Sequence, residues 1–485
     1  MLAEDHVAKA TFHGNLNPVQ GCWNLLKSIH NPIGFSEYLH RNFGLIAAFD
    51  MPALRRHRHR RHLFIVGPDY NRQVLRQTDS IRPSGLWSLD GPPGSALHAI
   101  QHNYLLKMYG DLHESIVQRA NRPLARSRVE GHFERTKAII QAETSQWPLG
   151  TALDLYDIAL KLAQRVSFTL LFGEMDLVRL RQFGDLVFEY NRANWKALCF
   201  LLPLRVPGTP YYRAWETAEA LRSHILDWVA EAAARSPEDD IVAAFAQVGS
   251  DRGGTIEVEQ IIGGMVFYAM ASFESMSSVT TWALVLLMLH PDIMRDLLDE
   301  ISAARPFMDI DPTRLSSLQL LDAVVKEVLR LVPPTAVAQF RVFNRCEVGG
   351  YTLLPSDRII MCPHMTHRLP EIYDAPKQFR PRRWFSIEPS QYAYLPFMAG
   401  PRRCPGSWFG TAFLKLALVA ILSQFRIELE RNVRVDWRFA GTTIPKRRIP
   451  VQLAKQDGVV KSQSACGSFF DLFEQPSMRN NEQSN

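Results

Sequence analysis

The sequence predicts a mainly α-helical domain with small β-sheets, an α+β fold built around one long central helix. Residues 257–290 are apolar nearly all round, which is typical of a helix that is buried on every side. At 1.5 Å per residue, such a helix would extend roughly 50 Å and cross a whole domain. Helical spacing of apolar residues also recurs over residues 104–183 and 318–331. Strand-like runs are short and lie in two separate parts of the chain, at residues 45–49, 63–66 and 348–361.

Glycine and proline set the boundaries of these elements. The Gly-Pro-Asp segment at residues 67–69 stops a strand-like run and precedes a predicted helix over residues 70–77. Residues 82–96 are rich in Gly, Pro and Ser and indicate a long loop, and such loops in compact domains often bind ligands. Pro291 ends the long helix.

Length and composition fit one large globular unit. The 485 residues are 46% hydrophobic and 21% charged, a balance typical of a protein with a large core. We expect a single domain over residues 1–454 and a disordered tail over residues 455–485, which are rich in Ser, Gln and Asn. No uninterrupted apolar run reaches membrane-spanning length, and residues 1–17 lack the form of a signal peptide. We therefore expect a cytoplasmic protein without a transmembrane segment.

Cysteine usage and charge agree with this expectation. The six cysteines are scattered without a CxxC pair, which excludes a disulfide framework or zinc site and fits a reducing cytosol. A net charge of +6 favours acidic partners only weakly, and we expect no nucleic-acid partner. The basic run at residues 55–62 could bind an anion, a metal or a partner protein. Charge runs usually face solvent, so we interpret it as a solvated turn before a strand.

Cys404 has the most informative neighbourhood in the chain. It lies between Gly400 and Gly406, two residues after Arg402, and an apolar segment typical of a helix follows at once. A helix N-terminus would favour a thiolate, and the glycines permit backbone angles and approaches that a Cβ forbids. Arg402 could pair with a carboxylate beside the loop. A thiolate near carboxylates indicates a haem whose iron is held by sulfur and whose propionates are held by arginine. The alternative is a buried, inert cysteine in a Gly-Pro turn.

The middle of the long helix carries an acid in apolar surroundings. Ala271, Ser272 and Ser275 are small residues on one side of this helix and would form a groove for a flat ligand or a small molecule. A buried carboxylate such as Glu274 is unfavourable unless it is paired or used, and Ser275 beside it has a hydroxyl that can pass a proton. In the purely structural alternative, Ser275 bonds back to the Ala271 carbonyl and Glu274 pairs with an arginine.

Glu327 and Arg330 lie three residues apart on a predicted helix and can form an ion pair. Their neighbours are apolar, so the pair would be buried, and a buried pair needs a further partner. Arg383 is the candidate for that partner.

Four motifs occur in a characteristic order. The long helix is recognised by Thr281-Trp282-Ala283 and His290-Pro291, an ExxR helix by Glu327 and Arg330, a PxRW segment by Pro381, Arg383 and Trp384, and an FxxGxRxCxG loop by Phe397, Gly400, Arg402, Cys404 and Gly406. Over roughly residues 68–454, this order and spacing resemble the cytochrome P450 superfamily of haem–thiolate monooxygenases.

The resemblance implies a cofactor and roles for these residues. The cofactor would be haem b, with Cys404 as the proximal iron ligand and Arg402 on one propionate. Arg341 resembles the arginine on the other propionate. His113 resembles a further propionate-binding position, where Val117 replaces the usual arginine and Arg119 could substitute. Glu327, Arg330 and Arg383 would form the structural triad behind the haem.

The oxygen-binding segment departs from the family pattern (A/G)Gx(D/E)T. Ser272 stands for the glycine and Ser275 for the threonine, whereas Glu274 keeps the acid. Serine allows the helix to open for dioxygen less freely than glycine does. The retained acid and hydroxyl imply that Glu274 and Ser275 relay protons to the bound oxygen.

The implied reaction inserts one oxygen atom of O2 into a C–H or C=C bond of an apolar small molecule. The pocket would be lined by the loop around Trp87 and by residues 195–202, 335–339 and 441–443. The sequence shows no flavin or iron–sulfur domain, so electrons would come from a ferredoxin- or flavodoxin-type donor and its reductase. Three basic residues near the cysteine loop could face that acidic donor, namely Arg402, Arg403 and Lys415.

Two other functions remain open from the sequence. A haem–thiolate isomerase, dehydratase or peroxygenase would need neither a proton relay nor a redox partner. Retention of Glu274 and Ser275 argues against it, whereas the altered Ser272 leaves it open. A non-catalytic haem-binding or ligand-sensing protein is disfavoured because no signalling domain is appended.

Overall fold

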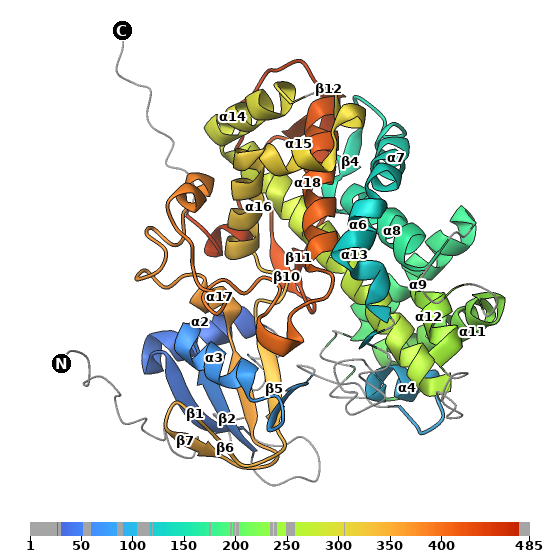
Figure 1. Cartoon of the computed structure of the whole chain (residues 1–485), viewed down its shortest axis with the longest axis vertical. Coiled ribbons are helices and arrows are strands. Elements are labelled where there is room, and N and C mark those ends of the chain that lie inside the picture. The colour runs from blue at the N-terminus through green and yellow to red at the C-terminus, as the bar shows by residue number, and fades with distance from the viewer. Residues whose placement is uncertain are drawn as a thin grey trace.

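The computed structural model describes Lys27 and residues 31–51, 60–84, 91–103, 117–118, 120–173, 176–194, 196, 199, 203–232, 236, 240–248, 258–304 and 306–474. A large helical part is joined to a smaller β-rich part that carries α2 and α3 (Figure 1). The prediction of a mainly α-helical fold with small sheets is therefore confirmed.

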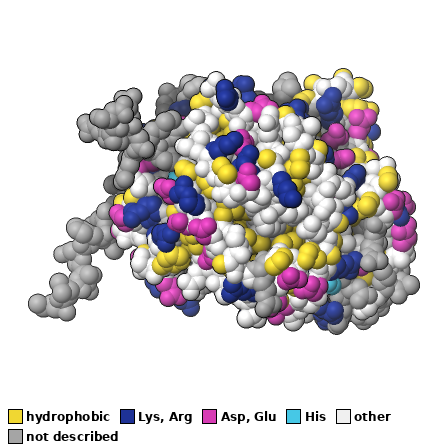
Figure 2. Space-filling model, turned by 90° about the horizontal axis from the view of Figure 1, so that it is seen from above, with side chains coloured by type: hydrophobic (Ala, Val, Ile, Leu, Met, Phe, Trp, Pro, Cys, Tyr) yellow, Lys and Arg dark blue, Asp and Glu magenta, His cyan; other side chains and the backbone are white. Residues whose placement is uncertain are grey.

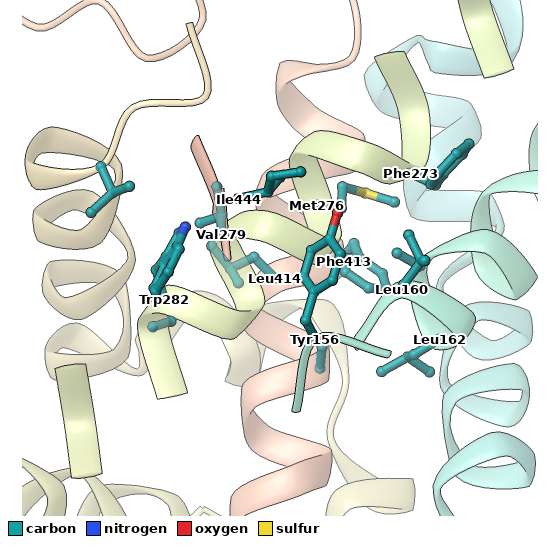
Figure 3. Packing of buried hydrophobic residues seen from close by; sticks show 14 of the residues in the cluster. Tyr156, Leu160, Leu162, Phe273, Met276, Val279, Trp282, Phe413, Leu414 and Ile444 are labelled. Carbon is teal, nitrogen blue, oxygen red and sulfur yellow. The ribbon is translucent and has the colours of Figure 1, made fainter. Parts of the chain in front are cut away.

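The long helix α13, Val258–Leu289, runs through the middle of the helical part (Figure 1). It ends where Pro291 starts α14, Pro291–Ser302, because proline cannot donate the next helical hydrogen bond. Figure 3 shows its buried side chains, among them Phe273 and Met276, packed among residues of the flanking helices α8, Leu155–Leu171, and α18, Ser407–Gln424. The other α-helices are α2 Pro32–Phe43, α3 Pro68–Arg76, α4 Ala96–His102, α6 Arg126–Gly131, α7 Phe133–Thr144, α9 Leu177–Asn194, α11 Pro210–Ala232, α12 Ile241–Val248, α15 Pro312–Ser317, α16 Gln319–Leu331 and α17 Pro363–Thr366.

Four small sheets complete the described fold. The largest has the strand order β1-β2-β8-β5-β3 and is antiparallel except between β2 and β8. A three-stranded sheet has the order β4-β12-β9, and two hairpins pair β6 with β7 and β10 with β11. The strands are β1 Ile46–Met51, β2 Arg60–Ile65, β3 Ile81–Ser84, β4 Ala152–Asp154, β5 Ala338–Val342, β6 Cys346–Val348, β7 Tyr351–Leu353, β8 Arg358–Met361, β9 Phe425–Leu429, β10 Trp437–Phe439, β11 Thr443–Pro445 and β12 Pro450–Lys455.

The structure corrects two expectations about polar segments. Residues 60–62 of the basic run belong to β2 rather than to a solvated turn, and the buried His62 stacks on Phe49 with ring centroids 5.7 Å apart; residues 55–59 lie outside the described residues. The expected disordered tail begins too early, because residues 456–474 are described and return to the core. Phe469, Leu472 and Phe473 are buried there, which explains why a polar composition did not leave the segment unfolded.

Two helices, α13 and α18, are long and apolar enough to cross a membrane, although the sequence was expected to hold no such span. Within the most apolar window, 89% of α13 and 61% of α18 are buried inside the protein, as in core helices of the same composition. The face in Figure 2 mixes basic, acidic and hydrophobic side chains.

Candidate active site

The loop before α18 presents Cys404 at its surface. The Cys404 N–H donates to the Phe397 carbonyl at 2.8 Å and closes the loop. Met398 and Gly400 both adopt positive φ, at 58° and 70°, so the chain turns sharply twice within three residues. The turn leaves the Cys404 thiol accessible immediately before the first turn of α18.

Gly400 is required by this geometry. A Cβ at Gly400 would lie 3.1 Å from the Leu75 carbonyl oxygen in a left-handed backbone conformation. We predict that Gly400→Ala lowers the free energy of unfolding by about 1–3 kcal/mol and reduces cofactor content. Gly410→Ala is the control, because its Cβ would meet only Phe397 at 3.8 Å within a helix. Urea unfolding of both variants tests this, and equal stability would contradict the role assigned to Gly400.

The sulfur lies beside the backbone of Gly406. A Cβ there would be 3.8 Å from the sulfur, an ordinary contact, and Gly406 has an ordinary negative φ of −79°. This residue therefore does not need the conformational freedom of glycine. Partial burial raises the pKa of the Cys404 thiol, although the Gly406 N–H and Arg403 oppose that rise. The Gly406 N–H at the helix terminus thus favours the thiolate, as expected, but burial of the sulfur has the larger effect on its pKa.

Glu327, Arg330 and Arg383 meet in a buried network behind this loop. Glu327 and Arg330 are fully buried on α16, and two hydrogen bonds of 2.8 and 2.9 Å join them. Arg383 Nε donates to Glu327 at 3.0 Å from the 3-10 turn Pro381–Phe385. The Trp384 indole and the Arg380 backbone N–H also donate to this carboxylate, at 3.0 and 2.9 Å. Although burial opposes ionisation, Arg330 and Arg383 lower the pKa of Glu327.

The same network fixes the chain that leads to the cysteine loop. Arg330 donates to the carbonyls of His367 and Pro376 at 2.8 and 2.7 Å. The His367 ring accepts from the Leu395 N–H at Nε2, 2.7 Å away, and lies 3.1 Å from the Arg330 carbonyl at Nδ1. His367 therefore connects α16 to the segment before Phe397. Sequence reasoning missed this histidine, because a single His in an apolar segment carries no distinctive signal.

One side of α13 is open within an otherwise buried helix. Between Ile262 and Leu289, every side chain is buried except Phe267, Met270, Ala271, Ser272 and Ser275. We call these five residues the open stripe; Phe267, Ala271 and Ser275 recur in it at four-residue intervals and so share a face. Ser272 bonds to the Ala269 carbonyl at 2.9 Å, and Ser275 forms no hydrogen bond within the described part of the chain. The alternative in which Ser275 bonds back to Ala271 is therefore wrong.

Glu274 points away from the open stripe, toward α9. Its carboxylate accepts a hydrogen bond of 2.5 Å from Asn191, so its partner is an amide and not the arginine of the structural alternative. No hydrogen bond joins Glu274 to Ser275. Burial raises the pKa of Glu274 to about 8, against the opposing effects of Asn191 and Arg438. The acid is therefore largely neutral at pH 7. Sequence reasoning missed Asn191, because nothing in its local sequence indicates which helix it meets.

The other residues predicted to bind the cofactor or the electron donor make fewer contacts or lie outside the described residues. Arg402 is half-buried in the 3-10 turn Gly400–Arg402. Arg341 is exposed on β5, with its guanidinium 5.5 Å from the Phe343 ring centroid. Lys415 pairs with Asp322 at 2.6 Å and is largely buried, so the expectation that it faces an electron donor is wrong. Outside the described residues lie Trp87, His113, Arg119, Trp195 and residues 200–202.

These residues fit a flat ligand that carries its own metal. Within the described part of the chain, no group of three His, Cys, Asp or Glu side chains could hold a metal ion. Haem would supply the other ligands of a metal on Cys404 from its own nitrogens. Burial raises the pKa of the Tyr268 phenol and Cys404 adds to this rise, which indicates that the thiol lies near α13. On the open stripe of the same helix, Ala271, Ser272 and Ser275 are small and not fully buried.

The comparisons with known proteins agree with this geometry. The family profile described as Cytochrome P450 matches residues 119–453. Pentalenene oxygenase of Streptomyces avermitilis is 26% identical over 68% of this chain and 74% of its own length. Cyclooctatin synthase of Streptomyces melanosporofaciens is 27% identical over 67% of this chain and 73% of its own length.

A solved structure supports the same fold. The retinoic acid-bound cyanobacterial CYP120A1 superimposes with a TM-score of 0.76 at 19% identity, over 89% of this chain and 96% of that chain. Because the family profile spans well over half of the sequence, the chain belongs to the cytochrome P450 family, whose members are oxidoreductases that bind haem through a cysteine thiolate.

Proposed function

We propose that this monooxygenase hydroxylates or epoxidises an apolar small molecule held against the open stripe of α13, with Cys404 as the iron ligand. The observation that carries the proposal is the pairing of one accessible thiol at the start of α18 with one open face on an otherwise buried helix. Bound haem supplies the iron that activates O2.

Glu274 would hold the proton that the reaction consumes. With a pKa of about 8 its carboxyl is mostly protonated at pH 7, and Asn191 fixes its orientation toward α9. The Ser275 hydroxyl lies on the open stripe and has no competing partner within the described part of the chain. Because no hydrogen bond joins the two, proton transfer requires Glu274 to turn from Asn191 or to act through a water molecule.

The residues on the cysteine side would hold the cofactor. Arg402, half-buried beside Cys404, is the candidate for one haem propionate. Arg341 and His113 remain candidates by resemblance for propionate contacts. The buried network around Glu327 would keep the cysteine loop rigid, since His367 connects it to the segment before Phe397.

Electrons would come from a separate acidic protein of the ferredoxin or flavodoxin type, with its reductase. Arg403 is exposed next to Cys404 and would contribute to that contact. The described cysteines are all free thiols, which supports a cytoplasmic location. The relative named for pentalenene makes this compound a reasonable first candidate substrate.

The test is turnover under 18O2. The purified haem protein is combined with a surrogate ferredoxin, its reductase and NADPH, and incubated with apolar compounds that include pentalenene. The proposal predicts a product that carries one 18O atom. An isomerised or dehydrated product without 18O would support the isomerase or dehydratase alternative. Oxidation by hydrogen peroxide alone, undiminished in Glu274→Gln with Ser275→Ala, would support a peroxygenase and contradict the proton relay.

A further inference from the structure

The C-terminal segment 465–474, which we call the C-terminal strap, lies beyond the residues that match the family profile. It pairs with the chain that leads into the β10–β11 hairpin. The Val435 N–H donates to the Cys466 carbonyl at 2.7 Å, and the Phe469 N–H donates to the Val435 carbonyl at 3.1 Å. A Cβ at Gly467, where φ is 119°, would lie 2.3 Å from the Val435 carbonyl oxygen. The close approach of the two chains therefore requires glycine.

Side chains extend this contact to the first residue of β10. The Ser468 N–H donates to the buried Asp436 carboxylate at 2.9 Å. The Ser468 hydroxyl accepts from the Trp437 N–H at 3.2 Å. Ser468 thus fixes both the residue before the hairpin and the residue that opens it.

The strap also supports the other strand of the hairpin through α13. The fully buried rings of Phe469 and Trp282 stack with centroids 4.1 Å apart and planes 14° apart. The Trp282 indole and the Ser278 hydroxyl both donate to the Thr443 carbonyl in β11, each at 2.6 Å. Figure 3 shows Trp282 beside Ile444, the next residue of β11. Phe469 therefore orients one of the two donors that attach β11 to α13.

The hairpin faces the acid of the proposed relay. Burial lowers the pKa of Arg438 in β10, whereas Tyr156 and Glu274 act to raise it, so the guanidinium lies near both acidic groups. Within the described part of the chain, the Arg438 Nε atom and the Thr442 hydroxyl are buried without hydrogen-bond partners. Because Ser278, which holds Thr443 of β11, is less than one helical turn from Ser275, the hairpin also lies next to the open stripe.

We infer that the C-terminal strap is a specificity-determining element, which positions the β10–β11 hairpin beside the reacting face of α13 and so sets the fit of the apolar substrate. This inference rests on the proposed function. Phe469 is a positioning residue, because it acts through Trp282. Without its ring, the hairpin would shift relative to α13 and the pocket would hold a bulky ligand less well.

The test compares two nitrogen ligands of the ferric haem protein. Imidazole occupies little more than the iron, whereas 4-phenylimidazole also fills the space around it. Spectral titration of Phe469→Ala is expected to show about tenfold weaker binding of 4-phenylimidazole and unchanged binding of imidazole, a ratio that corresponds to about 1.4 kcal/mol. Leu472→Ala removes another buried apolar side chain of the strap, at a residue whose carbonyl accepts from Arg368 at 2.6 Å, and is expected to leave both affinities unchanged.

The outcomes separate the inference from the proposed function. Equal effects of Phe469→Ala and Leu472→Ala, or an unchanged ratio in Phe469→Ala, would overturn the role of the strap. If Phe469→Ala does not fold, Ser468→Ala removes the hydroxyl through which the strap accepts from the Trp437 N–H of β10. An unchanged ratio in that variant would also overturn the role of the strap. Failure of the wild-type protein to bind either ligand at an iron would refute the proposed function instead.

Discussion

Glu327→Gln is expected to lower the free energy of unfolding by about 3–5 kcal/mol, because it leaves two buried arginines without their counter-charge. The Glu327 carboxylate is fully buried and accepts five hydrogen bonds. A glutamine would keep the volume but bring N–H groups against the donors of Arg330 and Arg383. Urea unfolding should show the loss, together with reduced haem content.

A matched control lies on α14, where Glu300 caps the start of the helix that carries Glu327. Glu300 accepts from the backbone N–H groups of Leu320 and Leu321 at 2.8 and 2.9 Å, and Glu300→Gln keeps one acceptor oxygen. Glu300→Gln should lower the free energy of unfolding by no more than about 1 kcal/mol. Similar losses in the two variants would contradict the structural role of the network.

The network also has a signature in pH. The pKa of Glu327 is lowered in the folded protein, so its contribution to stability is fully present above the ordinary glutamate pKa of 4.5. That contribution is lost as the pH falls through the lowered pKa of the folded state. The difference in the free energy of unfolding between wild type and Glu327→Gln should therefore be larger at neutral pH than in acid.

Glu274→Gln is expected to lower kcat by about 10²–10⁴-fold while it stabilises the fold at neutral and mildly alkaline pH. The unfolded glutamate ionises near pH 4.5, whereas the folded one binds its proton up to about pH 8. Between these values the folded state holds more protons, so the stability of the wild type falls by a few kcal/mol as the pH rises. Glutamine cannot ionise, and the amide oxygen can still accept from Asn191.

Two measurements check this prediction. Turnover of the first substrate identified under 18O2 should fall in wild type above about pH 8, as Glu274 loses its proton, and Glu274→Gln should be slow at every pH. Thermal unfolding at pH 7.5 or so should give a higher Tm for Glu274→Gln. Glu259→Gln, in the first turn of the same helix, is the control and should change neither the turnover nor the Tm. If Glu274→Gln lost both turnover and stability, Glu274 would have a structural role rather than a role in proton transfer.

The sequence was most informative where chemistry restricts residue choice. The loop of Cys404 was predictable because its glycines, arginine and cysteine follow one another at unusual short spacings. The Glu327–Arg330 pair alone was a weak signal, and its grouping with Arg383 was predicted from the order of the motifs along the chain. The partner of Glu274 was not predictable, since Asn191 meets it only through the packing of α9 on α13. Lys415 was misplaced for the same reason, because Asp322 lies on another helix.

The C-terminal strap shows a different limit. It lies within residues 455–485, whose overall Ser, Gln and Asn content predicted disorder, and such a prediction is a statement about average composition. Three phenylalanines were the signal in the other direction, and two of them, Phe469 and Phe473, are buried. A few aromatic side chains bury enough apolar area to order a short segment of a polar tail when a buried ring such as Trp282 is available to stack on.

The assignment of Cys404 as the iron ligand is tested most directly by the spectrum of the reduced protein with carbon monoxide. The wild type is expected to give the Soret band at about 450 nm that marks a thiolate ligand. Cys404→Ala should lose this band, whereas Cys466→Ala, which removes another exposed cysteine, should keep it. A wild type without the band, or a Cys404→Ala variant that retains it, would contradict the account.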